Sequence, residues 1–115
     1  MKNVLKEKSY SFAIRIVKLY KFLCDTKKEF ILSKQILRSG TAIGALIRES
    51  EFAHTKSEFI YKLNVALKEA NETEYWLNLL KDIEYLNEKM FNSIEPEIKE
   101  LIKLLISSIK TAKNN

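Results

Sequence analysis

The sequence predicts an all-α protein, namely an antiparallel up-down-up-down four-helix bundle that forms a single domain over residues 1–115. A chain of 115 residues can build one hydrophobic core but not two. Only two glycines and one proline are present, whereas sheets and loop-rich folds need many more turn residues. Apolar residues also recur at helical spacing in four stretches, which we place roughly at residues 9–26, 33–53, 56–87 and 93–111.

In the first stretch, residues 9–26, the apolar positions follow one another in helical steps. They are Phe12, Ala13, Ile16, Val17, Tyr20, Leu23 and Cys24. We expect this stripe to face the core, while Arg15, Lys18 and Lys21 between its members face water.

The second stretch, residues 33–53, begins at Ser33, a residue type favoured at helix N-caps. Two glycines inside a helix each cost about 1 kcal/mol relative to alanine, so Gly40 and Gly44 require compensation. We expect that compensation from the close approach of another helix backbone. The predicted core stripe is Ile36, Gly40, Ile43 and Ile47.

The third and fourth stretches carry their own start signals. Thr55 and Glu58 fit a capping box, which is the main reason for placing a break after the second stretch. The fourth helix is predicted to begin near Asn92 and Ser93, with Pro96 in its first turn, where a missing N–H costs little. The predicted stripe of the third stretch is Phe59, Leu63, Ala66, Ala70, Thr73, Leu77 and Leu80. The predicted stripe of the fourth is Ile98, Leu101, Ile102, Leu105, Ile109 and Ala112.

The net charge of +5 is distributed unevenly along the chain. Residues 1–34 carry nine basic and three acidic residues, a net +6, and residues 35–98 carry seven and eleven, a net −4. Residues 99–115 carry four lysines and one acid, a net +3. Because the first and last helices of an up-down bundle are neighbours, we expect the basic segments on one side and the acidic ones largely opposite.

This polarity has three interpretations: a face that binds nucleic-acid phosphates, a contact between the basic side of one subunit and the acidic side of the next, or a solvated surface. All but three of the 20 basic residues are lysines. Lysine binds phosphate as a point charge and reads base edges poorly, so nucleic-acid binding would have weak sequence specificity. The candidate nucleic-acid-binding residues are Arg15, Lys18, Lys21, Lys99, Lys103 and Lys110.

The residue counts exclude several classes of site. His54 is the single histidine and Cys24 the single cysteine, which excludes paired-histidine di-iron sites, Cys/His zinc sites and disulfides. The chain has no glycine-rich phosphate loop and no evident nucleophile–base pair, so we predict a non-enzymatic protein without metal or cofactor. It also lacks a membrane-spanning apolar run and an N-terminal signal peptide, and we predict a cytoplasmic location.

Two glutamates in the third stretch lie one helical turn apart, at Glu69 and Glu72, next to Thr73. If these carboxylates face inward they need cationic partners, because an unpaired buried carboxylate is costly. Arg38 and Arg48 on the second helix are the natural candidates. We therefore interpret the group as a structural ion-pair network rather than as catalytic residues.

Two sequence runs are specific in combination: residues 35–45, QILRSGTAIGA, and residues 66–77, ALKEANETEYWL. Together with Arg48 and Glu49 they resemble the 23S rRNA intervening-sequence proteins, over about residues 10–110. The resemblance implies an antiparallel four-helix bundle that assembles as a homopentameric ring. It extends to the accessory proteins of diversity-generating retroelements, which are similar basic pentameric barrels that bind nucleic acid and a reverse transcriptase.

The chain departs from the usual pattern of this family at two positions of the second helix. Ala42 stands where the family usually has serine, and Leu46 where it usually has asparagine. If both face inward, that part of the bundle has fewer hydrogen bonds to satisfy. The residues that keep the family pattern, and that we interpret first as architecture, are Arg38, Glu49, Glu69, Glu72 and Trp76.

The leading hypothesis from the sequence is a non-enzymatic, oligomeric helical-bundle protein that contacts RNA or DNA through a basic surface. The alternative is a structural or adaptor ring that binds a protein partner such as a reverse transcriptase, with the charge polarity serving self-assembly. Both hypotheses imply a homo-oligomer, a pentamer by the resemblance, and neither involves a membrane.

Overall fold

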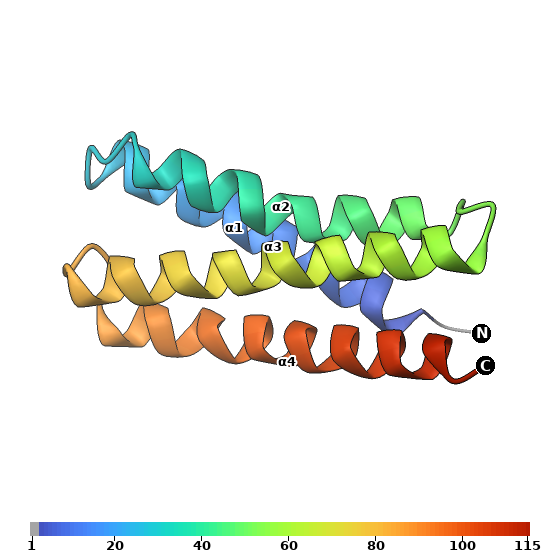
Figure 1. Ribbon diagram of the computed structural model, residues 1–115. Helices are drawn as coiled ribbons and strands as arrows, with labels where there is room; N and C mark the ends of the chain where they lie inside the picture. Colours follow the sequence, from blue (N-terminus) through green and yellow to red (C-terminus); the bar gives the residue numbers. More distant parts are fainter. Residues whose placement is uncertain (1–2) are drawn as a thin grey trace.

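The computed structural model describes residues 3–115, which form four long helices joined by short turns. These are α1 (Val4–Asp25), α2 (Leu32–Ser50), α3 (Lys56–Asp82) and α4 (Glu88–Lys113). They run alternately up and down in a rod of 46 × 22 × 21 Å, with the start of α1 and the end of α4 at the same end of the rod (Figure 1). The predicted all-α up-down-up-down bundle is confirmed, whereas residues 1–2 of the predicted domain lie outside the described residues.

Each helix packs against the next along the chain, and α1 closes the bundle against α4 through the sparsest of the four helix–helix contacts. The expectation that the first and last helices are neighbours is therefore met. In Figure 1, α1 and α4 lie furthest apart at the end that carries the α1–α2 and α3–α4 turns. Among residues 3–115, no helix combines the length and the apolar character needed to cross a bilayer.

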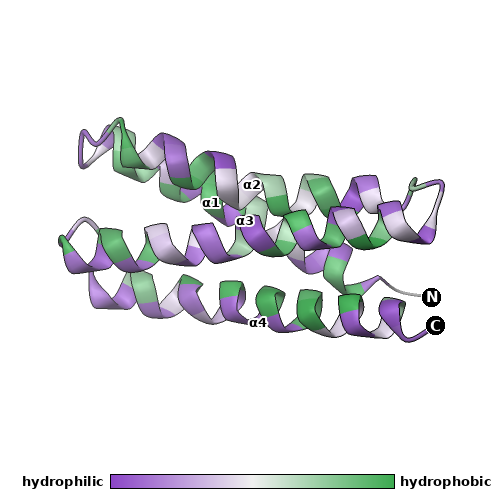
Figure 2. Cartoon of the chain, in the orientation of Figure 1, coloured by the Kyte–Doolittle hydropathy of each residue, from purple (hydrophilic) through white to green (hydrophobic). Residues whose placement is uncertain are grey.

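The core receives large side chains from all four helices, such as Phe12, Ile43, Leu77 and Leu105, each of which is fully buried. Hydrophobic and hydrophilic residues alternate around each helix in Figure 2, as amphipathic helices require. The predicted stripe of α2 is buried throughout. Phe59 of the α3 stripe and Ile102 and Ala112 of the α4 stripe are only half-buried.

The predicted stripe of α1 is wrong in part, because this helix carries two apolar rows. The first row faces the core, and its buried members are Leu5, Phe12, Ile16, Leu19 and Leu23. The second row, Tyr10, Ile14 and Val17, faces outward, with exposed fractions of 68%, 44% and 37%. The sequence pattern places Val17 in the core because the two rows lie close enough around the helix to be read as one wide stripe.

The start of α2 differs from the prediction. Ser33 is not the N-cap but a buried residue inside the first turn. The cap is supplied from the preceding turn by Glu29, whose carboxylate accepts hydrogen bonds from the backbone N–H groups of Ser33 at 2.7 Å and Ile31 at 3.2 Å. A carboxylate is favourable here because it satisfies free N–H groups and faces the positive end of the helix dipole.

The other helix starts show side-chain caps. Thr55 accepts a hydrogen bond from the Glu58 N–H at 3.0 Å, as the capping box predicts, while the Glu58 carboxylate accepts from the N–H of His54 at 3.1 Å. Helix α4 begins earlier than predicted, because Asn87 caps it by accepting from the Met90 N–H at 2.8 Å. Pro96 therefore lies inside α4 and not in its first turn.

The two glycines of α2 lie where α1 crosses closely. A Cβ atom on Gly40 would lie 2.8 Å from Cγ1 and 2.9 Å from Cγ2 of Ile16, closer than real Cβ atoms approach. A Cβ atom on Gly44 would lie 3.3 Å from the backbone oxygen of Ser9. The expected backbone approach thus occurs at Gly44, whereas the space at Gly40 is filled by a core side chain.

Candidate nucleic-acid interface

Arg15, the one arginine among the predicted nucleic-acid-binding residues, binds to other residues of the bundle. Its guanidinium donates hydrogen bonds to the backbone oxygen of Ser93 at 2.9 Å and to the Ser93 hydroxyl at 2.8 Å, and it forms an ion pair with Glu97. These partners lie on α4, so Arg15 bridges the open α1–α4 seam. The side chain is half-buried, and its charge is partly neutralised by Glu97.

Lys99 is also paired with acidic residues. Its Nζ lies 3.2 Å from the Glu95 carboxylate of the same helix and 4.0 Å from that of Glu74 on α3. The hydrogen bond to Glu95, and then the charges of Glu95 and Glu74, raise the pKa of Lys99. Both partners thus favour the charged form of the amine, and Lys99 lies on the side of α4 that faces α3.

The other four predicted residues, Lys18, Lys21, Lys103 and Lys110, are exposed and form no ion pair with residues 3–115. Lys103 and Lys110 follow Lys99 at helical spacing and share its side of α4. Lys18 and Lys21 lie one turn apart on α1. The structure thus brings the six residues into two separate groups and not into one surface.

The expected separation of basic and acidic sides is also incomplete. Glutamates of α4 lie at the α1–α4 seam itself, where Lys8 pairs with Glu100 at 3.1 Å and Arg15 pairs with Glu97. The charge pattern of the sequence does not predict the pair with Glu97, because this residue belongs to the acidic middle of the chain, which we expect opposite the basic segments.

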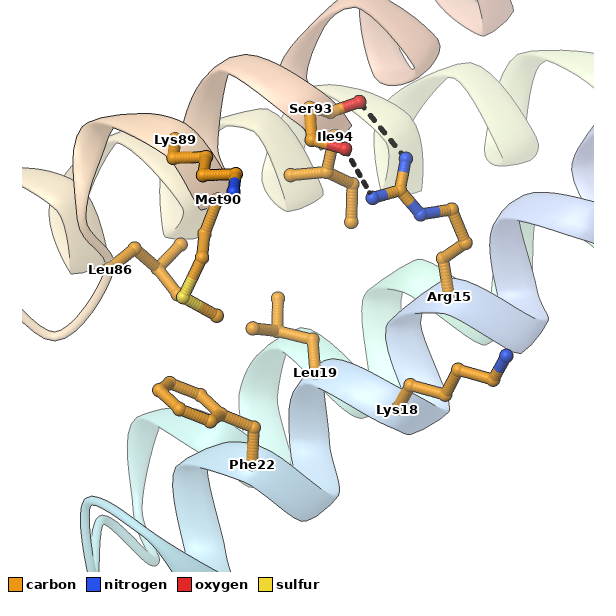
Figure 3. A pocket seen from close by; sticks show the side chains of 9 residues that line it. All are labelled: Arg15, Lys18, Leu19, Phe22, Leu86, Lys89, Met90, Ser93 and Ile94. Carbon is orange, nitrogen blue, oxygen red and sulfur yellow. Dashed lines mark hydrogen bonds between the residues drawn. The ribbon is translucent and has the colours of Figure 1, made fainter.

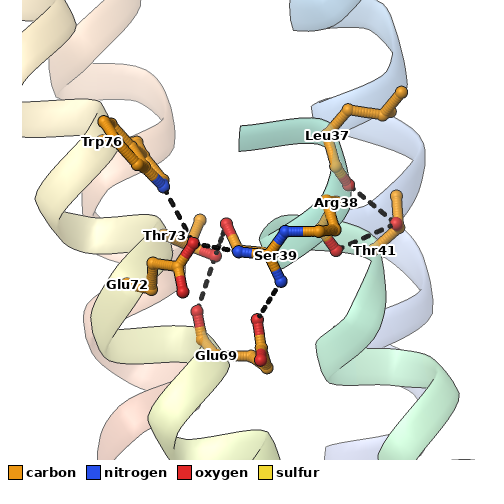
Figure 4. Close-up of polar contacts among 8 residues, drawn as sticks. All are labelled: Leu37, Arg38, Ser39, Thr41, Glu69, Glu72, Thr73 and Trp76. Carbon is orange, nitrogen blue, oxygen red and sulfur yellow. Dashed lines mark hydrogen bonds and ion pairs between the residues drawn. The ribbon is translucent and has the colours of Figure 1, made fainter. Parts of the chain in front are cut away.

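A polar network joins α2 to α3 on the opposite side of the bundle (Figure 4). The Arg38 guanidinium donates to the Glu69 carboxylate at 3.1 Å and pairs with Glu72. The Trp76 indole N–H donates to the same Glu72 carboxylate at 3.1 Å. Arg38 thus provides the cation predicted for both glutamates, whereas Arg48 is not part of this network and lines a groove between α1 and α2.

Beneath this network lies a buried pair of hydroxyl groups. The Thr73 hydroxyl lies 2.8 Å from the Glu69 backbone oxygen, to which it donates, and 2.9 Å from the Ser39 hydroxyl. Both residues are fully buried, and among residues 3–115 no buried side-chain nitrogen or oxygen lacks a partner. The arrangement is that of a satisfied helix–helix contact, in which the buried side-chain polar atoms have partners.

Glu49 forms a second link between α2 and α3. Its carboxylate accepts a hydrogen bond from the Lys62 Nζ at 2.9 Å, which raises the pKa of Lys62 through that bond and then through the charge of Glu49. Leu46 is half-buried and packs against the core, and Ala42 is also half-buried. Apart from the Ser39 hydroxyl, the α2 face toward α3 is therefore mainly apolar between its ion pairs at Arg38 and Glu49.

The single histidine and the single cysteine do not form a catalytic or metal site together in the described part of the chain. His54 is exposed in the α2–α3 turn. Cys24 is half-buried, with its sulfur 3.7 Å from the Ser33 hydroxyl, and its hydrogen bond to Tyr20 raises the pKa of that phenol. Among residues 3–115, no group of three or more histidine, cysteine or acidic residues is placed to hold a metal ion.

Comparison with known proteins places this architecture in a family. The 23S rRNA-intervening sequence protein family matches residues 1–107. The chain is also similar to a protein with unknown function from the S23 ribosomal protein family of Bacteroides thetaiotaomicron VPI-5482, for which there is a crystal structure. The two sequences are 61% identical, and the structures superpose with a TM-score of 0.92 over 93% of this chain and 99% of that one. No curated protein matches the chain. The bundle described above therefore belongs to the family of 23S rRNA-intervening sequence proteins.

Proposed function

We propose that this protein is a non-enzymatic helical bundle that contacts RNA through exposed lysines, with weak sequence specificity. The observation that carries the proposal is that Lys18, Lys21, Lys103 and Lys110 are exposed and form no ion pair with residues 3–115, in a chain of net charge +5. Unpaired lysines are free to replace the counterions of phosphate groups, which favours binding without base recognition.

Two further points support RNA as the nucleic acid and the cytoplasm as the compartment. The family is named after an intervening sequence of 23S rRNA, and the Bacteroides relative is assigned to a ribosomal protein family. The free thiol of Cys24 suits a reducing compartment. DNA is the alternative ligand, because phosphate contacts alone do not distinguish the two polymers.

A mobility-shift titration of a 23S rRNA fragment over a series of salt concentrations tests this proposal. We expect affinity to fall steeply with salt, and the Lys18→Gln/Lys21→Gln variant to bind more weakly. On single-stranded RNA its salt slope should be smaller by about 0.7 for each phosphate that the variant no longer neutralises. The matched control is Lys8→Gln/Lys62→Gln, which removes the same charge from lysines that are held in ion pairs. Binding that is independent of salt, or an equal loss of affinity in both variants, would contradict the proposal.

A second candidate function, assembly into a ring that binds a protein partner, is favoured by the outward row of α1. Tyr10, Ile14 and Val17 are exposed, and Tyr10 also lines a groove of about 520 Å³ between α1 and α2. Adjacent exposed apolar side chains of this kind mark protein–protein contacts. We propose that this row is the contact between copies of the chain, with a pentamer as the expected assembly by family resemblance and a reverse transcriptase as one candidate partner.

Light scattering coupled to size exclusion tests the assembly. We expect the wild-type protein to run as an oligomer and Ile14→Glu to run as a 13.5 kDa monomer, because a buried charge at the contact would be left unpaired. Ile106→Glu is the matched control, since Ile106 is exposed to a similar extent on α4. A monomeric wild type, or equal dissociation of both variants, would count against this contact.

Charge reversal at Lys18 and Lys21 separates the two candidate functions. If these lysines contact RNA, the reversed variant loses RNA binding while its oligomeric mass is unchanged. If they contact the acidic side of a neighbouring subunit, the same variant dissociates.

A further inference from the structure

A cavity of about 530 Å³ opens between α1 and α4 where the two helices diverge (Figure 3). Its walls are apolar and come from α1, the α3–α4 turn and α4. They consist of Leu19, Phe22, Leu86, Met90 and Ile94. This volume lies within the range of about 300–1,000 Å³ that is typical of small-molecule sites.

The polar residues at the mouth of this cavity include three cations, of which Arg15 is paired with Glu97. Arg15, Lys18 and Lys89 line it together with Ser93. In Figure 3 the Arg15 guanidinium reaches across from α1 to Ser93 on α4, while Lys18 extends along the rim, away from the apolar side chains. Lys18 and Lys89 are exposed and form no ion pair with residues 3–115, so their charges are free to interact with a ligand.

The cavity is bounded at both ends, which limits the size of its occupant. The Arg15–Ser93 bridge crosses the α1–α4 seam at one end, and Leu86 in the α3–α4 turn lies at the other. A helix from a partner protein would need a groove that continues along the seam. A short ligand with an apolar body fits between the two ends.

We propose that this cavity binds a small amphipathic anion, namely an unbranched alkyl chain that ends in one acid group. The chain would lie against Leu19, Phe22 and Met90, where burial of its methylene groups stabilises the complex. The acid group would lie at the mouth beside Lys89, where an anion complements the unpaired lysines of the rim. This site is separate from the proposed RNA contact except for Lys18, so its test does not use that residue.

Isothermal titration with three probes of equal chain length tests the proposal: decanoate and decyltrimethylammonium, each below its micellar concentration, and decanol below its solubility limit. We expect decanoate to bind at least tenfold more tightly than decanol, and decyltrimethylammonium not to bind. Amide shifts in a ¹H–¹⁵N NMR spectrum with decanoate should cluster around Leu19, Phe22 and Met90.

The variant Lys89→Glu should weaken decanoate binding at least tenfold and leave decanol binding unchanged, since only the charged head group faces Lys89. Lys103→Glu is the matched control, because it makes the same charge change on α4 at a residue that does not line the cavity. Equal affinity for decanoate and decanol, equal weakening by both variants, shifts confined to the α1–α2 groove, or no decanoate binding would each overturn the proposal.

Discussion

Replacing Gly40 by valine is expected to destabilise the bundle by about 3 kcal/mol, because the space beside Gly40 is already occupied. Even the first added carbon would lie 2.8 Å from Cγ1 of Ile16, and both residues are buried. Valine has a better helix propensity than glycine by only a fraction of 1 kcal/mol, which does not offset the overlap. Urea unfolding followed by circular dichroism measures the change in the free energy of unfolding.

The double variant Gly40→Val/Ile16→Ala provides the control for this interpretation. Ile16→Ala alone should cost about 2–5 kcal/mol by leaving a cavity in the core. Since the valine fills that cavity, the double variant should be more stable than the sum of the two single effects by about 0.5–3 kcal/mol. Simple additivity of the two effects would contradict the packing at Gly40.

Replacing Arg38 by methionine is expected to cost about 1 kcal/mol, because it leaves the Glu69 and Glu72 carboxylates close together without their cation, whose side chain is itself exposed. Methionine retains the length and the helix propensity of arginine, so the loss of charge dominates the effect. Trp76 is the only tryptophan and its indole bonds to Glu72, so its fluorescence reports on this network directly. The measurement is urea unfolding followed by Trp76 emission.

Arg48→Met is the matched control, since Arg48 lies on the same helix and is exposed, and it forms no ion pair with residues 3–115. It should change the free energy of unfolding by less than about 0.5 kcal/mol. Adding Glu72→Gln to Arg38→Met should recover part of the lost stability, because one of the two adjacent negative charges is removed. An equal effect of the two arginine variants would show that the network does not stabilise the bundle.

The core-facing sides of α2 and α3 could be predicted most fully because their apolar residues form one narrow row each, although α2 ends at Ser50 and not at residue 53, and α3 at Asp82 and not at residue 87. Ile36, Ile43 and Ile47 all point to the core, and the Thr55 cap marks the start of α3. Periodicity could not give the face of α1, where Val17 belongs to an outward row that only the packing distinguishes from the core row. The start of α2 was also misplaced, because the capping group is Glu29, a side chain outside the helix.

For the candidate site, the sequence indicates which residues carry charge more reliably than which residues they pair with. The Arg38 partner of Glu69 could be expected from the motif, since both belong to facing helices in a simple bundle. The partner of Arg15 could not, because its pairing with Glu97 depends on how far α1 and α4 slide along each other. The α1–α4 cavity depends in the same way on the divergence of two helices, for which the sequence has no periodic signal.

Pro96 has a consequence for how α4 opens. It lacks the N–H that would bond to the backbone oxygen of Asn92, so the ladder of α4 is interrupted between its first two turns and the remainder. Asn92 and Pro96 are both exposed, so water can take up the free oxygen. Because the stretch before Pro96 has one backbone bond fewer, we expect it to open more readily than the rest of α4 and its amide protons to exchange with solvent faster. The wall of the α1–α4 cavity that includes Met90 belongs to this stretch, so we expect the cavity to widen by local opening rather than by global unfolding.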